Sequence, residues 1–112
     1  MLFRSIEKWR TTANDYADKE ELIYEWQNDM DCRRLINELL LTLDPAIREK
    51  FNIELKSIDD KLKAKTFEVN ECIWGTKNEL ELKYNRKDNW YYYRVNQLVF
   101  NDERDIYTKY SP

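Results

Sequence analysis

Residues 32–65 read CRRLINELLLTLDPAIREKFNIELKSIDDKLKAK. Apolar residues recur every three or four positions from Cys32 to Leu43 and again from Ile47 to Leu62, which is the spacing of an amphipathic helix. Asp44-Pro45 separates the two runs, and this pair is typical of an N-cap followed by the first residue of a helix. Because the connection is so short, the stretch predicts an antiparallel helical hairpin that ends near Lys65.

The segment before this hairpin has the same helical spacing. Apolar positions run from Leu2 to Ala17, and a second set follows from Leu22 to Met30. Asp18 and Glu21 stand three residues apart, as in a capping box that begins a helix. Two interpretations of Asn28, Asp29 and Asp31 are open, since they either end the second helix or lie within it. Single helices of this length are not stable alone, so we expect a mainly α fold, a bundle of three to four helices over residues 2–65.

The C-terminal part, residues 66–112, has a different pattern. Residues 66–80 fit either a helix or a strand, whereas the alternation of apolar and charged residues from Leu80 to Tyr84 favours a strand. The sequence WYYYRV at 90–95 is rich in strand-forming residues. A short aromatic-rich hairpin over Leu80–Val95 is one interpretation, and an irregular segment is the other. In both, we expect this part to complete the core of a single domain, residues 1–112.

The composition excludes most enzyme classes. The chain has no His and one Gly in 112 residues, so it lacks the commonest general base and zinc ligand and cannot form a glycine-rich phosphate loop. We therefore expect no enzymatic activity, no cofactor and no metal. Charged residues make up 37% of the chain, with a mean hydropathy of −0.90. Four Trp, eight Tyr and four Phe nevertheless indicate an ordered domain, because disordered chains are poor in aromatic residues.

The sequence also bears on location. No apolar run approaches the roughly 20 residues of a membrane span, and the N-terminus lacks the apolar block of a secretory signal. Cys32 and Cys72 lie among apolar neighbours without metal-type spacing, which favours free, buried thiols. We expect a cytoplasmic protein that does not contact a membrane.

Acidic residues are concentrated in one segment. Between Asp15 and Asp31, seven acidic residues stand against one lysine, a local charge of −6 in a chain whose total is −3. On a continuous helix, four of these would line one face: Asp18, Glu21, Glu25 and Asp29. Such like charges repel by about 0.2–0.5 kcal/mol per pair, so the face is a candidate docking surface for a basic partner. The alternative is a solvated face near a helix N-terminus, where acids are tolerated.

Aromatic and basic residues are interleaved near the C-terminus. Of the segment Trp90–Arg94, we assign Trp90, together with Trp74, to the core, and Tyr91 and Tyr93 to the surface as candidate anchors for a partner. Lys83, Arg86, Lys87 and Arg94, with Asp88, give this region a local charge of +3. Basic residues among aromatic rings are what single-stranded nucleic acid requires, but the acidic pI of about 5.1 makes nucleic acid the less expected partner. Lys61, Lys63 and Lys65 fit the C-terminal end of a helix, where cations complement the dipole.

The sequence Cys72-Ile73-Trp74-Gly75, followed by Trp90 to Val95, resembles the ending of many small bacterial immunity proteins. These proteins neutralise the toxin domains of polymorphic and contact-dependent growth inhibition systems. In that family a Trp-Gly pair precedes an aromatic-aromatic-Tyr-Arg segment that commonly ends in Val-Pro or Ile-Pro, and this chain has Asn96 in place of the Pro. The resemblance implies a non-enzymatic inhibitor that binds one cognate toxin in the cytosol.

Many such toxins are basic nucleases, so the resemblance also implies that an acidic surface occupies a cationic substrate cleft. Three other functions are compatible with the residues. They are a nucleic-acid-binding module that uses the basic and aromatic segment, an acidic nucleic-acid mimic that acts on a DNA enzyme, and a structural helical subunit that forms homo-oligomers.

Overall fold

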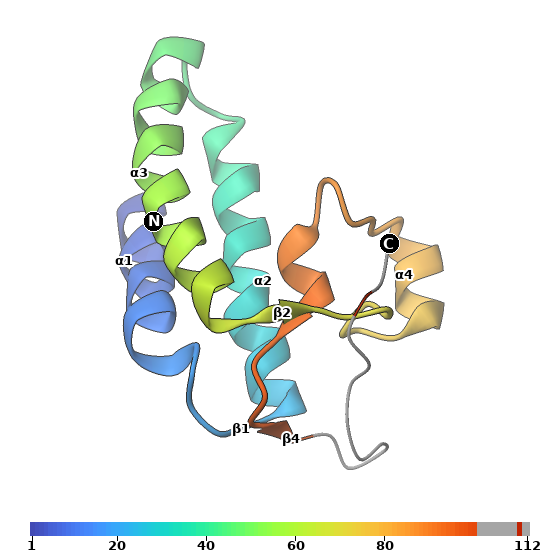
Figure 1. Cartoon of the computed structure of the whole chain (residues 1–112). Coiled ribbons are helices and arrows are strands. Elements are labelled where there is room, and N and C mark those ends of the chain that lie inside the picture. Colours follow the sequence, from blue (N-terminus) through green and yellow to red (C-terminus); the bar gives the residue numbers. More distant parts are fainter. Residues whose placement is uncertain (101–109, 111–112) are drawn as a thin grey trace.

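The computed structural model describes residues 1–100 and 110. It is mainly helical, as the sequence predicts, with three longer helices packed as a bundle: α1 (Leu2–Thr11), α2 (Ile23–Leu40) and α3 (Pro45–Lys65). Helix α2 runs antiparallel to both α1 and α3, and the upper half of the α2–α3 hairpin extends beyond α1 (Figure 1). Within the described residues, no helix is both long enough and apolar enough to cross a bilayer.

The predicted helical hairpin around Asp44-Pro45 is confirmed. Asp44 precedes α3 in an extended conformation, Pro45 is its first residue, and the helix ends at Lys65. The guanidinium of Arg48 donates hydrogen bonds to the carbonyls of Leu40 (3.1 Å) and Leu43 (3.0 Å). These bonds tie the first turn of α3 to the end of α2 and to the connection between the two helices. Helix α2 also runs without a break through residues 28–31, which settles the point that the sequence left open.

The helix predicted through Ala17 is confirmed as far as Tyr16, but the helix start predicted at Asp18 is wrong. Helix α1 passes into a π-helix, η1 (Thr12–Tyr16), and a turn follows, so that α2 begins at Ile23 and no side chain caps it. Two contacts from distant residues explain this: the side-chain amide of Asn96 donates to the carbonyls of Ala17 (2.8 Å) and Lys19 (3.0 Å). In addition, β1 (Glu21–Leu22) pairs in parallel with β4 (Val99–Phe100). These tertiary contacts override the local capping signal.

The predicted hairpin over Leu80–Val95 is also wrong, and the irregular alternative is correct. Residues 76–82 form a short helix, α4 (Thr76–Leu82), preceded by Gly75 at a φ of 88° and followed by Lys83 at a φ of 58°. Leu80 and Leu82, which suggested a half-buried strand, are exposed. The sequence WYYY forms a 3-10 helix, η2 (Trp90–Tyr93). Residues 66–80 thus contain both kinds of element, since β2 (Phe67–Glu68) pairs antiparallel with β3 (Arg94–Val95).

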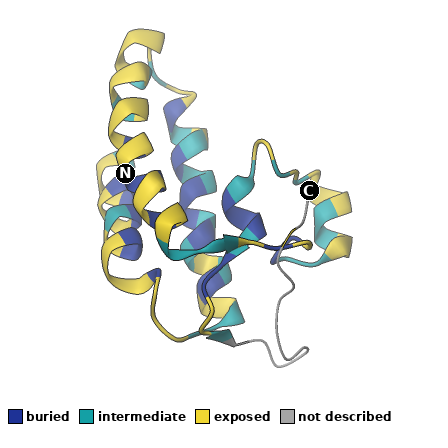
Figure 2. Cartoon of the chain, viewed as in Figure 1, coloured by how far each residue is buried: buried dark blue, intermediate teal, exposed yellow. Residues whose placement is uncertain are grey.

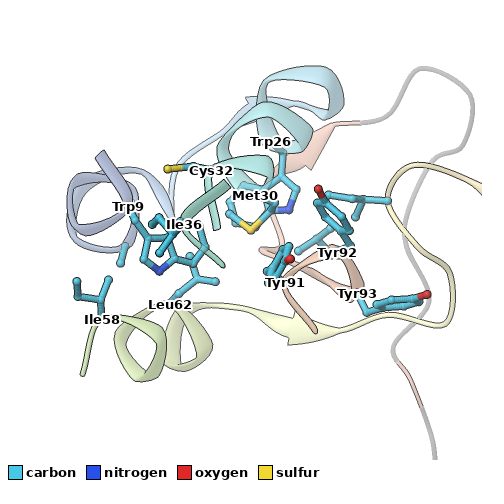
Figure 3. Close-up of a cluster of buried hydrophobic side chains, with 14 of the residues drawn as sticks. Trp9, Trp26, Met30, Cys32, Ile36, Ile58, Leu62, Tyr91, Tyr92 and Tyr93 are labelled. Carbon is cyan, nitrogen blue, oxygen red and sulfur yellow. The ribbon is translucent and has the colours of Figure 1, made fainter. Parts of the chain in front are cut away.

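The core lies where the three longer helices face one another and where η2 closes one side of the bundle. Figure 2 shows buried residues concentrated on these inner faces, whereas the outer face of α3 is exposed. In Figure 3 the rings of Trp9 and Trp26 and the side chain of Met30 lie between the helices, with Tyr91 and Tyr92 beside them. The aromatic C-terminal part therefore completes the core, as the sequence predicts.

One buried carboxylate joins all three bundle helices. Asp59 of α3 accepts hydrogen bonds from Nε and Nη2 of Arg33 in α2, both at 3.0 Å, and from Nε1 of Trp9 in α1 at 2.9 Å. Both charged side chains are almost fully buried. Because the pair is bidentate and the third donor is also satisfied, the group fixes how the helices align with one another.

Candidate partner-binding surface

Three of the four acidic residues that the sequence singled out lie together at one end of the bundle. Glu21 is in β1, and Glu25 and Asp29 follow on α2, with their carboxyl groups close enough to interact. Figure 1 shows that β1, β4 and the start of α2 lie at the end opposite the α2–α3 connection. Asp18 is exposed in the preceding turn and lines a separate cavity of about 410 Å³ with Lys65 and neighbouring residues. The four residues therefore do not form the single helical stripe that was predicted.

Glu21 differs from its two acidic neighbours. Burial, followed by the nearby carboxyls of Asp29 and Glu25, raises the pKa of Glu21 to about 8. Its Oε2 atom is buried without a hydrogen-bond partner among the described residues. At neutral pH Glu21 is therefore mostly protonated, because the charged form has lost water and faces like charges.

Among the residues that the structure describes, these carboxylates have no counter-ion. Within residues 1–100, no Lys or Arg forms an ion pair with Asp18, Glu21, Glu25 or Asp29. Asp31, two residues after Asp29 on α2, contrasts with them. Burial alone would raise its pKa, but hydrogen bonds from Arg34 and from the hydroxyl of Tyr92 outweigh that effect and hold the pKa below its usual value. Asp31 is thus a structural residue, whereas Glu25 and Asp29 are available to an external cation.

The aromatic residues at the surface are not those that the sequence indicated. Tyr91 is 0% and Tyr93 is 3% exposed, so the prediction that they are surface anchors is wrong. The 3-10 turn of η2 directs consecutive rings inward, and the Tyr93 hydroxyl is held by Glu79 and by the carbonyl of Tyr84.

Trp74 and Trp90, which the sequence placed in the core, pack against it and are half-buried. Tyr24 instead presents its ring to solvent. It lies between Glu21 and Glu25 in the sequence and is 57% exposed. We define the acidic end as Glu21, Tyr24, Glu25 and Asp29.

The basic residues that lie together in the structure differ from those that the sequence grouped. Of the four cations near the aromatic segment, Arg86 and Arg94 line a common pocket, whereas Lys83 and Lys87 are exposed outside it. Lys63 of α3 joins the two arginines. The sequence explained Lys63 by the helix dipole alone and contained no signal that it meets residues about 30 positions away.

The described residues include no group of three or more Asp, Glu or Cys placed to hold a metal ion. The acidic end presents two carboxylates without a counter-ion among the described residues, a protonated carboxyl group and an exposed phenol ring. These groups suit the binding of a cationic protein surface. No protein-family model, curated protein or solved structure matches this chain.

Proposed function

We propose that this chain is an immunity-type protein that neutralises a bacterial toxin domain in the cytosol by binding it directly. The acidic end is the docking surface in this proposal. The observation that carries it is that Glu25 and Asp29 form no ion pair with a described residue, at the end of α2 where Tyr24 is also exposed. The resemblance of residues 72–96 to immunity proteins supports the same conclusion independently.

The electrostatics favour a basic partner. Neighbouring carboxylates without counter-ions repel each other in the free protein, and a Lys or Arg of a partner relieves that repulsion. The same cation lowers the pKa of Glu21, since it stabilises the ionised form of a carboxyl that is protonated in the free protein. Docking therefore converts a surface with internal repulsion into a set of ion pairs, which speeds encounter and selects the partner.

The partner with this chemistry is a nuclease-type toxin with a cationic substrate cleft, in which the carboxylates take the places of phosphates. Tyr24 supplies the ring that anchors such interfaces, because a phenol buries area at little cost in rotamer entropy. A stable interface needs about 800 Å² from each partner, which is about a tenth of the 7336 Å² surface of this chain.

Capture from the native organism's lysate tests the proposal, with the bound protein identified by mass. The baits are the wild type, Glu25→Lys at the acidic end, and Glu49→Lys on the exposed face of α3 as a control with the same change of charge. We expect the wild type and the control to retain a stoichiometric toxin domain and Glu25→Lys to retain much less. Co-expression of the wild type should then protect cells from that domain.

Other outcomes would contradict the proposal. Capture of a host or phage DNA enzyme by the acidic end would indicate a nucleic-acid mimic. Equal capture by all three baits would exclude the acidic end as the docking surface. Self-association without a foreign protein, seen as a larger species in size-exclusion chromatography, would indicate a structural subunit.

A further inference from the structure

A second concave site lies between α3, β2 and η2. It is a pocket of about 250 Å³ lined by three cations, one carboxylate and two aromatic rings: Lys63, Arg86, Arg94, Glu68, Trp90 and Tyr93. The site shares no residue with the acidic end, and its charge has the opposite sign. Whatever fills it is thus chemically different from the cationic partner proposed above.

The two arginines are held in place by uncharged groups. Arg94 donates from Nε to the Thr66 hydroxyl (2.8 Å) and from Nη2 to the carbonyls of Lys63 (3.2 Å) and Thr66 (3.0 Å). Arg86 lies between the rings of Tyr93 and Tyr110, at 4.6 and 3.9 Å from their centroids, and donates from Nη2 to the carbonyl of Asn70 (2.7 Å). These contacts orient the guanidinium groups without cancelling their charge, so their ordering entropy is lost before any ligand arrives.

The carboxylate of Glu68 does not neutralise the three cations that line the pocket. Glu68 is shared between the two arginines, at 3.5 Å from Arg86 and 3.9 Å from Arg94, and its side chain is 47% exposed. The ammonium of Lys63 lies 4.5 Å from the centroid of the Trp90 ring and forms no ion pair with a described residue. With three cations and one carboxylate, the described residues that line the pocket carry a surplus of about two positive charges.

We propose that this pocket binds the phosphate group of a nucleotide, either free or within a single strand. A phosphate monoester carries a charge of about −1.5 to −2 at neutral pH, which matches the surplus in the pocket. The Nη1 atoms of Arg86 and Arg94, which lie toward the partly exposed Glu68, remain to donate to phosphate oxygens. The volume of about 250 Å³ leaves room for an attached sugar or base beside Trp90, and an aromatic ring next to cations is the combination that single-stranded nucleic acid uses.

Calorimetric titration at low salt with four probes tests this proposal: inorganic phosphate, uridine monophosphate, a ten-residue oligothymidylate and a hexapeptide of Asp and Glu. The variants are Lys63→Glu, which reverses a charge in the pocket, and Glu68→Gln, which removes the one carboxylate. Lys61→Glu is the matched control, because Lys61 is exposed on the same helix and does not line the pocket. Amide spectra of each variant establish that the fold is kept.

We expect at least one of the three phosphate probes to bind with a Kd of about 1 mM or tighter. Lys63→Glu should weaken binding by about tenfold, Glu68→Gln should tighten it several-fold, and Lys61→Glu should change it by less than about twofold. Binding of uridine monophosphate identifies a free nucleotide as sufficient, and binding of the oligonucleotide alone identifies a strand.

Three results would overturn the proposal. The first is the absence of binding by every phosphate probe, and the second is an equal loss for Lys63→Glu and Lys61→Glu. The third is binding of the acidic hexapeptide in preference to all phosphate probes, which would assign the pocket to a protein partner. None of these results bears on the acidic end, so the two proposals fail separately.

Discussion

Replacement of Asp59 by Ala should be among the most destabilising single changes in this protein. Asp59 accepts three hydrogen bonds, two from Arg33 and one from Trp9, at 2.9–3.0 Å. Its removal leaves the Arg33 guanidinium buried without a counter-ion, which costs about 3–5 kcal/mol. A domain of 112 residues has a free energy of unfolding of about 6–17 kcal/mol in total, so this one change should remove a large fraction of it.

Urea denaturation, followed by tryptophan fluorescence and far-ultraviolet circular dichroism, measures the loss. Asp60→Ala is the matched control, because the neighbouring Asp60 is exposed and forms an exposed ion pair with Lys56 on the same helix. Its replacement should cost less than about 0.5 kcal/mol. The double variant Arg33→Met/Asp59→Leu should be more stable than Asp59→Ala, since no unpaired charge remains. If the free energies of unfolding of Asp59→Ala and Asp60→Ala differ by less than about 1 kcal/mol, the reasoning about the buried ion pair is refuted.

Three further predictions concern other parts of the fold. The pKa of Glu21 is about 8 in the folded protein and 4.5 in an unperturbed carboxyl, so the folded state retains a proton that the unfolded chain has released. The contribution of Glu21 to stability should be full below about pH 4.5 and decline by about 1 kcal/mol as the pH rises towards 8. Glu21→Gln should flatten this decline in thermal melts at pH 5 and 8, and a slope equal to that of the wild type would contradict the assignment. Asn96→Ala should lower the free energy of unfolding by about 2–3 kcal/mol, because the amide holds the turn before β1. The exposed neighbour Gln97 should tolerate Ala, and similar urea midpoints for the two variants would argue against that role of Asn96. Cys32 and Cys72 are both buried, and burial raises the pKa of each thiol. A disulfide reagent should therefore label them only after unfolding, and rapid labelling of the native protein would show that they are accessible.

The part of the fold that the sequence predicts best is the part whose conformation is set by local residues. The hairpin of α2 and α3 follows from helical spacing and from Asp44-Pro45, both of which act within a few positions of the chain. The course of residues 17–22 does not follow in this way, because it depends on Asn96, which lies 79 positions from Ala17 in the sequence. Leu80 and Leu82 alternate as in a strand, yet they lie on the short helix α4, where both are exposed.

In the candidate sites, too, the sequence predicts local features and not those that depend on distant residues. The accumulation of acidic residues is visible in the sequence, but the raised pKa of Glu21 requires the burial that β1 imposes. Tyr24 is exposed and Tyr91 is buried because their side chains point in different directions. The amino-acid composition of the two segments does not reveal those directions. Lys63 reaches the basic pocket only because β2 and β3 bring the end of α3 next to η2.

The central claim is that the acidic end binds a basic toxin domain directly. The measurement that tests it most directly is the association rate of the captured toxin domain, determined by surface plasmon resonance at two salt concentrations. The matched proteins are the wild type, Glu25→Lys and Glu49→Lys. We expect Glu25→Lys to slow association by about tenfold at low salt and less at high salt, with Glu49→Lys close to the wild type. Association rates that are the same for all three proteins, at both salt concentrations, would contradict the claim.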